Sequence, residues 1–361
     1  MRVAGLMSGT SLDGVDVAVV DIERGRIARV VAHKSFPYPP EVRKRLLAVS
    51  NAVTHTAEIS RLHFLLPELY ARAVKRCGVP LHRIELIGCH GQTVYHESGA
   101  NTLQLGDGSV LAERTGIPVV SDFRPRDIAA GGRGAPLVPF ADYLLFRDRR
   151  TGRVALNLGG IGNVTVIPAG AKPTEVVAFD TGPGNMVIDA LVQRYTGGKH
   201  LYDRNGALAS RGHVHEGLLD RILAGAYYRL KPPKSAGREQ YGQDFVEELT
   251  NTRLSAADLI ATATALTPAA VAVGLDRFAR CPLHEIVVSG GGARNRTMMG
   301  YLAAFLPVLR VRTSAEFGIG IDAKEAVAFA LLAHETWQRR ASNLPSATGA
   351  SRAVVLGKIS W

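Results

Sequence analysis

The chain has 361 residues, of which 46% are hydrophobic and 21% are charged, and its net charge is +11. This composition is typical of a globular protein, and we expect no membrane segment because no apolar run approaches the roughly 20 residues that span a bilayer. The length exceeds what one hydrophobic core supports, which predicts two domains with a ligand between them.

The basic charge does not indicate nucleic-acid binding, because the arginines are scattered along the chain instead of forming a stripe with aromatic residues. A solvated basic surface that also attracts anionic small molecules explains it better. Cys77, Cys89 and Cys281 lack metal-site spacing and are expected to be reduced. Because the apolar run Val3–Met7 is too short for a signal peptide, we expect a cytoplasmic location.

The first 22 residues place a turn rich in Gly, Ser, Thr and Asp between two apolar runs, which predicts a strand, a phosphate-binding turn and a second strand. Gly9 and Gly14 leave backbone N–H groups open to an anion. Thr10 and Ser11 add hydroxyl donors, and Asp13 adds an oxygen for Mg²⁺. The turn lacks the Lys-Ser/Thr of a Walker A loop, and an ordinary glycine-rich hairpin is the alternative.

Residues 26–35 are predicted to form a third strand, and residues 41–49 and 56–77 have the apolar spacing of helices. Residues 84–89 form a short apolar strand that leads into His90-Gly-Gln-Thr93. Polar residues directly after a strand lie where open α/β sheets bind ligands.

Residues 109–115 are predicted to be helical and residues 117–121 to be a strand, and the Gly, Pro and Arg-rich stretch 122–139 is interpreted as a domain crossover. Residues 154–167 then repeat the order of strand, glycine-rich turn and strand. This internal echo indicates a duplicated architecture.

In the second half, a strand at 176–179 ends at Asp180 and a helix follows from Met186 to Tyr195. Residues 201–243 are polar and are interpreted as a surface segment and candidate lid. Ser255 is predicted to cap a helix, and Thr267-Pro268 is predicted to open another.

Residues 285–295 predict a strand and a glycine turn before a helix, and residues 318–325 lead into an apolar helix at 326–336. Two glycine-rich hairpins and a third glycine turn resemble the architecture shared by actin, hexokinase and the 70-kDa heat-shock proteins. The motifs themselves resemble the 1,6-anhydro-N-acetylmuramic acid kinase family over nearly the whole chain. They are Gly5-Leu-Met-Ser-Gly-Thr-Ser-Leu-Asp-Gly-Val-Asp16, His90-Gly-Gln-Thr93, Asn157-Leu-Gly-Gly-Ile-Gly-Asn163, Phe179-Asp-Thr-Gly-Pro-Gly-Asn185 and Ser289-Gly-Gly-Gly-Ala-Arg-Asn295.

The resemblance implies a duplicated actin-like ATPase (ribonuclease H-like) α/β fold, with two domains around a nucleotide cleft. We expect domains at residues 1–130 and 131–361, with the alternative that the C-terminal helix packs back on the first domain. The resemblance also implies an ATP- and Mg²⁺-dependent kinase of cell-wall recycling that opens the 1,6-anhydro ring with water and phosphorylates O6. It implies a homodimer, with neither nucleic acid nor membrane as a partner.

For the nucleotide, the resemblance implies three groups of residues. The first turn, with Asp13 as the Mg²⁺ ligand, contributes Gly9, Thr10, Ser11, Leu12, Asp13, Gly14, Val15 and Asp16. The second turn contributes Gly159, Gly160, Gly162 and Asn163. Gly290, Gly291 and Gly292 are expected to lie against adenosine.

Because O6 is an ether oxygen without a proton, the base has to act on the water that attacks C1. Asp180 is the candidate base, and a cap for the following helix is its structural alternative. Glu325 is the candidate second carboxylate beside C1, and an ordinary first-turn glutamate is its alternative.

The lactyl carboxylate of the substrate requires a cation, for which Arg133 is the first candidate, with Arg124 and Arg126 as competitors and a surface role as the alternative. His90 and Gln92 are candidate hydrogen-bond partners of the sugar, although a buried structural histidine is equally compatible. Two rival functions are an ordinary hexosamine kinase on the same fold and a nucleotide-switched structural or chaperone protein.

Overall fold

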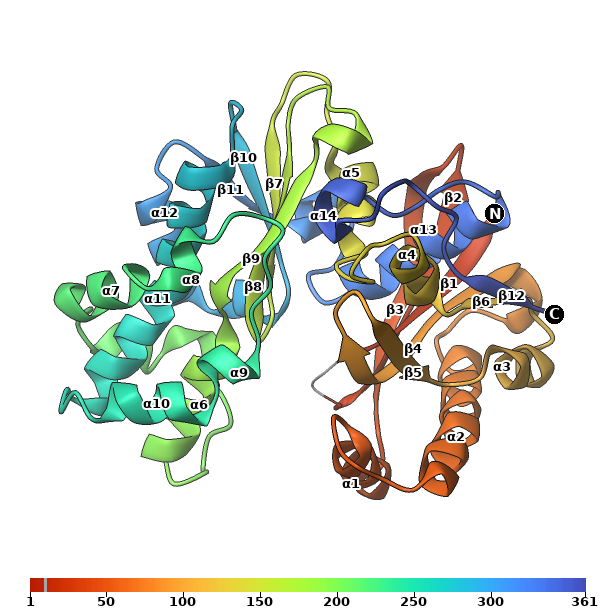
Figure 1. The fold of residues 1–361 in the computed structure, drawn as a ribbon, viewed down its shortest axis with the longest axis horizontal. Coiled ribbons are helices and arrows are strands. Elements are labelled where there is room, and N and C mark those ends of the chain that lie inside the picture. The colour runs from red at the N-terminus through yellow and green to blue at the C-terminus, as the bar shows by residue number, and fades with distance from the viewer. Residues whose placement is uncertain (10–11) are drawn as a thin grey trace. The chain divides into compact units, whose positions relative to one another are not determined.

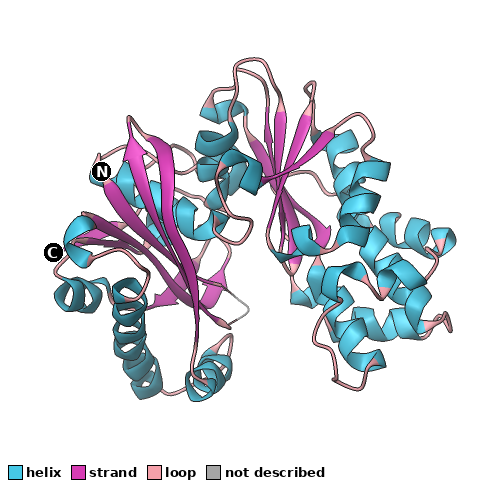
Figure 2. Cartoon of the chain, turned by 180° about the vertical axis from the view of Figure 1, so that it is seen from behind, coloured by secondary structure: helices cyan, strands magenta, loops and turns pink. Residues whose placement is uncertain are grey.

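The structure, a computed structural model, describes residues 1–9 and 12–361 and divides the chain into two compact units. Unit 1 contains Met1–Leu145 and Gly318–Trp361, and unit 2 contains Phe146–Phe317. Each unit has one β-sheet with helices packed against it (Figure 1 and Figure 2). The structure therefore confirms an α/β protein with two sheets.

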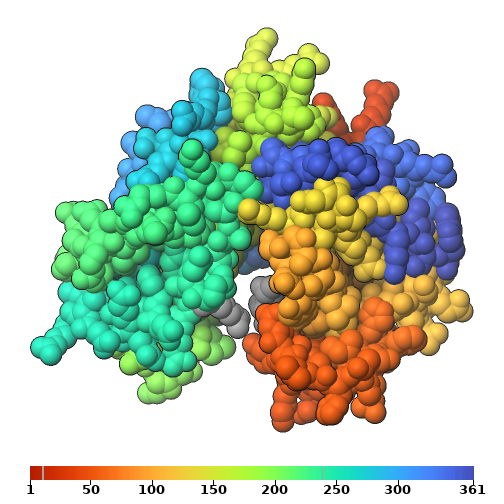
Figure 3. Space-filling view, in the orientation of Figure 1, coloured from red at the N-terminus to blue at the C-terminus, as the bar shows by residue number. Residues whose placement is uncertain are grey.

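These boundaries differ from the expected domains at 1–130 and 131–361. Helix α5 (Val138–Phe146) lies in unit 1 except for its last residue, and the segment from Gly318 returns to unit 1. In the space-filling view this C-terminal segment, in blue, borders the yellow part of unit 1 (Figure 3). Its helix α13 (Lys324–Trp337) is buried almost throughout, and burial of that apolar surface holds the segment on unit 1.

The sheet of unit 1 runs in the order β12-β6-β4-β1-β2-β3, with β5 paired to β4. β1 and β2 are antiparallel, β2 and β3 are antiparallel, and β4 and β6 run parallel to β1. The strands are β1 (Arg2–Ser8), β2 (Gly14–Glu23), β3 (Arg26–Pro37), β4 (Leu86–Glu97), β5 (Asn101–Leu105), β6 (Val119–Ser121) and β12 (Lys358–Ser360).

The sheet of unit 2 runs in the order β11-β10-β7-β8-β9 and repeats this pattern. Its first three strands are antiparallel neighbours, and β10 and β11 run parallel to β7. The strands are β7 (Arg153–Leu158), β8 (Ile161–Ile167), β9 (Val177–Pro183), β10 (Glu285–Ser289) and β11 (Arg310–Thr313). The predicted duplication is therefore present in the strand order of the two sheets.

In unit 1, helices cover the sheet because their apolar sides meet the buried valines and leucines of the strands. These helices are α1 (Pro40–Val49), α2 (Thr56–Lys75), α3 (Gly108–Thr115), α4 (Phe123–Ala129), α5, α13 and α14 (Pro345–Thr348), with a 3-10 turn at Leu81–Arg83. Helix α13 approaches the sheet closely, since a Cβ at Gly88 of β4 would lie 2.7 Å from the Ala333 side chain. Glycine and alanine are thus required where α13 crosses the strands.

The helices of unit 2 enclose a second core around β7, β8 and β10. They are α6 (Asn185–Tyr195), α7 (Glu216–Leu223), α8 (Ala226–Arg229), α9 (Arg238–Tyr241), α10 (Gln243–Thr250), α11 (Ala256–Phe278) and α12 (Arg296–Phe305). The 3-10 turns are Pro173–Glu175, Arg204–Gly206, Ala209–Arg211, Gly291–Arg294 and Ser314–Phe317. The stretch 201–243, expected to be surface chain, contributes Leu218, Tyr228 and Tyr241 to this core.

Helix α11 corrects two expectations. It begins at the predicted Ser255 cap, whose hydroxyl accepts from Asp258 N at 3.1 Å, but it continues through Pro268 instead of restarting there. The Thr267 hydroxyl donates to the Pro183 carbonyl at 2.9 Å and fixes this turn of α11 to the end of β9. The 23 residues of α11 have a mean hydropathy of 1.5 over their most apolar stretch, which is long enough to cross a membrane, but most of it is buried in unit 2. The expectation that no apolar run reaches this length was therefore wrong.

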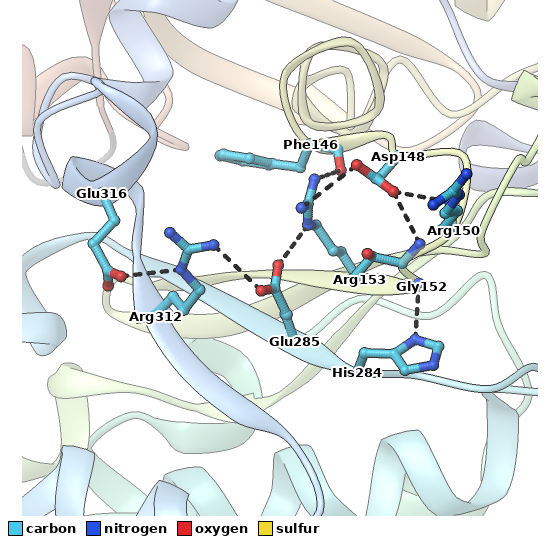
Figure 4. A network of polar contacts seen from close by, with 10 residues as sticks. Phe146, Asp148, Arg150, Gly152, Arg153, His284, Glu285, Arg312 and Glu316 are labelled. Atoms are coloured by element: carbon cyan, nitrogen blue, oxygen red, sulfur yellow. Dashed lines mark hydrogen bonds and ion pairs between the residues drawn. The ribbon is translucent and has the colours of Figure 1, made fainter.

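A charged network ties together the strands at one edge of the unit 2 sheet (Figure 4). Glu285 at the start of β10 pairs with Arg153 of β7 at 2.7 Å and with Arg312 of β11 at 3.2 Å. Arg312 also pairs with Glu316 at 3.0 Å. Because β7 and β10 begin at this edge, their carboxyl ends and the glycine turns after them lie at the opposite edge.

Candidate active site

The first glycine-rich turn joins β1 to β2 in unit 1. Thr10 and Ser11 lie outside the described residues. Leu12 has a φ of 54°, its N–H donates to the Gly9 carbonyl at 3.2 Å, and its side chain is buried, whereas Asp13 is exposed. A Cβ at Gly14 would lie 2.9 Å from the Phe36 carbonyl carbon, so close packing requires this glycine. Leu12 and Gly14 anchor the turn, and Asp13 is left accessible.

Val15 and Asp16 continue the chain into β2. The Val15 side chain is buried in the unit 1 core, so a nucleotide contact by Val15 is available only through its backbone. Asp16 is half-buried and accepts a hydrogen bond from the Ser35 hydroxyl on β3, and His33 lies 3.7 Å away. The side chains of Val15 and Asp16 thus both make contacts within unit 1.

Gln92 holds the start of the first turn through side-chain hydrogen bonds. Its side-chain N–H donates to the Gly9 carbonyl at 3.0 Å, and its Oε1 accepts from the Ser8 hydroxyl at 2.5 Å. Strand β4 does not end at Cys89 as predicted but continues to Glu97, with an irregular register and a φ of 73° at Gly91. This irregularity brings Gln92 opposite Ser8. The contacts favour support of the turn over direct hydrogen bonding to a sugar.

Both ring nitrogens of His90 also form hydrogen bonds within unit 1. The ring is 3% exposed, its Nδ1 bonds the Gly91 carbonyl at 2.7 Å, and its Nε2 accepts from Arg124 Nη2 at 2.9 Å. Burial and the Arg124 charge lower the pKa of His90 to about 3, so the ring is neutral. Arg124 Nη1 in turn donates to the Gly134 carbonyl at 2.8 Å. The geometry favours the structural histidine, which orients Arg124.

The loop that carries Arg133 is held by a buried carboxylate and the C-terminal segment. Asp127 is fully buried and accepts from Gly134 N at 2.8 Å, and its other oxygen accepts from Asn343 at 2.7 Å and from Thr348 at 2.8 Å. The Arg133 N–H donates to the Thr348 carbonyl at 2.9 Å. The backbone around Arg133 is therefore fixed, and its side chain is half-buried. Arg126, by contrast, is exposed and donates to the Val355 carbonyl at 3.2 Å.

Glu325 lies in the first turn of α13 among charges from several elements of unit 1. Burial raises its pKa, Lys324 lowers it, Asp16 and Asp142 raise it, and Arg124 lowers it. Lys324 pairs with Asp142 of α5 at 3.0 Å, and both side chains are 2% exposed. Glu325 is thus a desolvated carboxyl beside Arg124. Its position is compatible with both predicted readings, the second catalytic carboxylate and the first-turn glutamate.

The second glycine-rich turn joins β7 to β8 in unit 2. The Gly159 carbonyl accepts from Asn185 N and the Gly160 carbonyl accepts from Gly184 N, both at 2.8 Å. The carbonyls therefore point toward the start of α6. A Cβ at Gly159 or at Gly160 would come no closer than 3.7 Å to the nearest atoms, and neither glycine has a positive φ. Nothing in the protein requires glycine there, which favours close approach by a ligand.

The third glycine turn follows β10 and contrasts with the second. Gly290 has a φ of 83°, and a Cβ there would lie 2.8 Å from the Leu158 carbonyl oxygen. A Cβ at Gly292 would lie 2.6 Å from the Leu158 side chain. These two glycines are required by packing against the end of β7, whereas a Cβ at Gly291 would meet its nearest atom only at 3.9 Å. Of the three, Gly291 is the one open to a ligand.

Gly291 lines a hollow of about 710 Å³ within unit 2. Asp189 also lines it, and burial together with Asp203 raises the pKa of Asp189 to about 7. The lining residues are Asn185, Ile188, Asp189, Tyr202, Asp203, Arg204, Asn205, Gly291, Arg294 and Asn295. The volume and mixed lining suit a small organic ligand of nucleoside size.

Asp180 lies on β9, which runs parallel to β7 and ends at the same edge of the sheet as the second and third turns. Its carboxylate accepts from Ala236 N at 2.9 Å. Burial raises its pKa, the Ala236 hydrogen bond and Lys234 lower it, and Glu239 raises it, with a result of about 6. Asn163 is its cross-strand partner on β8, so these two side chains share one face of the sheet. Gly162 is packed nearby, since a Cβ there would lie 3.0 Å from Thr181 Oγ1.

The alternative interpretation of Asp180 as a helix cap is wrong. Helix α6 begins after Gly184, which has no side chain to cap it, and the N–H groups of Asn185 and Met186 donate to the Gly159 and Gly160 carbonyls at 2.8 and 3.3 Å. The carboxylate instead bonds Ala236, a residue of the stretch 201–243.

Several residues of the site were not singled out from the sequence. Lys234 belongs to the polar stretch 201–243, which the sequence indicates only as surface chain, and Asp189 lies in the middle of a helix. No short motif marks either residue, because both depend on chain that is distant in sequence. The pairing of Arg124 with His90 spans 34 positions and likewise has no local signal.

Comparison with known proteins identifies the family. The family described as Anhydro-N-acetylmuramic acid kinase matches residues 1–361. A protein of that name from Caldanaerobacter subterraneus is 45% identical over 381 aligned residues, covering 99% of this chain and 96% of the relative. Another from Bacillus cereus is 40% identical, with 100% and 99% covered.

Among solved structures, the activator of a 2-hydroxyisocaproyl-CoA dehydratase from Clostridium difficile aligns with a TM-score of 0.47 and 11% identity, covering 94% of this chain and 96% of that one. This likeness is too distant to add to the assignment. The relatives, in contrast, match from end to end at high identity. On that ground, the chain belongs to the anhydro-N-acetylmuramic acid kinase family.

Proposed function

We propose that this protein transfers the γ-phosphoryl group of ATP to O6 of 1,6-anhydro-N-acetylmuramic acid while water opens the anhydro ring. The products are N-acetylmuramic acid 6-phosphate and ADP, and the role is in cell-wall recycling. Membership of the family supports the substrate. The observation that carries the mechanism is the Asp180 carboxylate, which lies at the glycine-turn edge of the unit 2 sheet and does not cap a helix.

The reaction determines what the base has to do. O6 is bonded to both C6 and C1, so it has no proton to lose. Asp180 accepts a proton from water as the water oxygen bonds to C1 and the C1–O6 bond breaks. O6 takes the electron pair of that bond and attacks the γ-phosphorus, and the phosphorus–oxygen bond to ADP breaks.

The surroundings of Asp180 suit this role. With a pKa of about 6, the carboxylate is mostly ionised at pH 7 yet more basic than an ordinary aspartate. The Ala236 N–H occupies one carboxylate oxygen, which leaves the other for water. Asn163 lies beside it, and we propose that Asn163 contacts the reacting groups there and not only the nucleotide.

Positive charge develops at C1 as the C1–O6 bond breaks, as in glycoside hydrolysis. We propose that Glu325 stabilises it. Its raised pKa reflects burial, and a desolvated carboxylate interacts more strongly with a cation than one in water.

For the nucleotide, the open backbone at Gly159 and Gly160 supports phosphate binding at the second turn. The hollow beside Gly291 supports adenosine binding, with Asp189 as a hydrogen-bond acceptor for hydroxyl groups. The first turn would add backbone donors at Gly9 and the accessible carboxylate of Asp13.

The residues present fit Mg²⁺ in the manner usual for kinases. No cluster of three or more His, Cys, Asp or Glu side chains occurs among the described residues, so an all-protein cage is not available in that part of the chain. Mg²⁺ usually takes one or two carboxylates and keeps phosphate and water ligands. Asp13 would supply the carboxylate. When bound, Mg²⁺ neutralises charge on the phosphate oxygens.

The lactyl carboxylate is assigned to Arg133, with Arg124 next to Glu325 as the second cation. Arg126 is less suited, because it is exposed and bonded to the Val355 carbonyl. We also propose a cytoplasmic location and, as the family resemblance implies, a homodimer, which size-exclusion chromatography with light scattering would test.

The deciding experiment is turnover in ¹⁸O water with ATP, Mg²⁺ and 1,6-anhydro-N-acetylmuramic acid. We expect the label at C1 of the sugar and none in the phosphate group. Label in phosphate, without phosphorylated sugar, would show that the enzyme only hydrolyses ATP, and this would contradict the proposal.

A substrate comparison separates the proposal from an ordinary hexosamine kinase. N-acetylmuramic acid with an open ring carries a free C6 hydroxyl, which requires a base at O6 instead of at C1. We expect it to be a poor substrate. Equal turnover of the two sugars would favour the ordinary kinase.

A further inference from the structure

A single stretch of unit 2, residues 227–239, surrounds Asp180. The Lys234 carbonyl accepts from Asp180 N at 3.1 Å, and Ala236 N donates to the Asp180 carboxylate at 2.9 Å. The Tyr227 hydroxyl donates to the Asp180 carbonyl at 2.7 Å. Residues before and after Lys234 thus contact Asp180, and a backbone hydrogen bond from Asp180 N fixes Lys234 itself beside the proposed base.

The ammonium group of Lys234 is buried in an aromatic cage. Lys234 is 8% exposed, and its Nζ donates to the Tyr227 carbonyl at 3.2 Å. Nζ lies 4.5 Å from the ring centre of Tyr227, 5.2 Å from that of Phe278 and 5.7 Å from that of Phe179. Ring faces attract a cation, so the cage favours the charged form in a place where burial opposes it.

Among the side chains that the structure describes, few charges act on Asp180 and Lys234. Tyr227, Lys234 and Glu239 act on the Asp180 carboxylate, and Arg277 of α11 acts on Lys234. Burial lowers the pKa of Lys234 to about 8, with Arg277 acting in the same direction and Asp180 opposing both. Below that pH, Lys234 is a cation beside the proposed base.

We propose that Lys234 is a positioning residue for the reaction, whose backbone carbonyl holds the Asp180 backbone and whose buried charge keeps the Asp180 carboxylate ionised. This inference rests on the proposed role of Asp180 as the base. It explains why this lysine is buried although no described carboxylate lies in salt-bridge contact with it. The charge of Lys234 stabilises the ionised form of Asp180, the carboxylate needed for the chemistry, and leaves it accessible to water.

The test is the pH profile of kcat. Protonation of Asp180 abolishes the base, so kcat of the unaltered enzyme falls as the pH drops through about 6. In Lys234→Met the stabilising charge is absent, the carboxylate binds its proton more tightly, and the acid limb moves upward by roughly one pH unit. Lys234→Arg keeps the charge, and we expect its limb within a few tenths of a unit of the unaltered enzyme.

Lys231→Met is the matched control, because Lys231 is an exposed lysine three positions earlier in the same stretch. Its acid limb should stay in place. The melting temperature of each variant monitors the fold, and Lys234→Gln, which can still donate to the Tyr227 carbonyl, replaces the Met variant if that one fails to fold.

The outcomes distinguish a failure of the proposed function from a failure of the inference about Lys234. If the unaltered enzyme yields no phosphorylated sugar, the proposed function fails. If it does, and a folded neutral variant at position 234 has the same acid limb as the unaltered enzyme, the inference about Lys234 is wrong. An upward shift that arginine abolishes supports it, because a loss of packing alone lowers kcat at every pH equally.

Discussion

Asp180 in unit 2 and Glu325 in unit 1 are the two carboxylates with proposed roles in the reaction, and each has a buried lysine nearby, but the two lysines are used differently. Lys324, next to Glu325, forms a 3.0 Å ion pair with Asp142 in which both side chains are 2% exposed. Lys234, near Asp180, lies among aromatic rings and donates to a carbonyl.

The difference shows what each charge is available to do. Lys324 lowers the pKa of Glu325, but Asp16 and Asp142, the ion-pair partner of Lys324, raise it. Lys234 has no carboxylate at such a short distance among the described residues, and its charge lowers the pKa of Asp180. We infer that the Asp180 region is arranged for proton transfer, whereas the Glu325 region is arranged for electrostatic stabilisation and binding.

The substitution Asp180→Asn should have the largest effect, a loss of kcat. The Asn side chain keeps an oxygen that accepts from Ala236 N, so the fold should hold, but it cannot take a proton from water. We expect kcat to fall roughly 10²- to 10⁴-fold while both substrates still bind. Turnover is measured together with the melting temperature and substrate affinity by calorimetry. A fully active variant would contradict the different roles given to Asp180 and Glu325, and Glu325 would then be the candidate base.

Lys324→Met should affect stability before chemistry. It removes the cation that pairs with the buried Asp142, and removing one partner of a buried pair destabilises a protein by about 3–5 kcal/mol. Chemical denaturation measures this, with Lys44→Met as the control, because Lys44 is exposed on α1 of the same unit. Equal midpoints for the two variants would show that the Lys324 pair contributes nothing measurable.

Asp13→Ala should weaken the use of Mg²⁺·ATP and spare the sugar. Asp13 is exposed at the first turn, so its loss should leave the fold unchanged. We expect KM for ATP to rise roughly 10- to 100-fold, the range for losing one charged contact. Calorimetric titration with the sugar is the check, and a comparable loss of sugar affinity would contradict the assignment.

Arg133→Ala should act on the sugar alone. We expect KM for the sugar to rise roughly tenfold, and the loss should shrink for an analogue without the lactyl carboxylate. Arg126→Ala is assayed in parallel. A larger loss in that variant, or an equal loss of Arg133→Ala with both sugars, would move the carboxylate contact to another residue.

The duplicated fold was predictable from the sequence because its turns are local. Glycine-rich segments at 8–14 and 158–163 lie between apolar strands, and the structure places β1, β2, β7 and β8 around them. The domain boundary was less predictable, since residues from 318 onward return to unit 1 through packing of α13 on distant strands. No signal within a single segment reports such a contact.

The candidate site was predictable to the same degree. The position of Asp180 at the edge of a sheet follows from a strand that ends in a glycine turn. Its surroundings do not follow, because Lys234 and Ala236 reach it from a stretch that reads as polar surface chain. Likewise, His90 and Gln92 read as polar groups open to ligand, and only the tertiary structure shows that Arg124 and Gly9 occupy them.

The glycines of unit 2 fall into two kinds with different evolutionary constraints. Gly290 and Gly292 have backbone or side-chain atoms within 3 Å of where a Cβ would be, so folding alone maintains them. Gly159 and Gly160 have ordinary free space there, and alanine would also reduce the conformational freedom of the unfolded chain. A population of sequences selected only for folding would therefore drift away from glycine at 159 and 160 while keeping it at 290 and 292. Retention of the first pair would reveal that selection for nucleotide use is still in force.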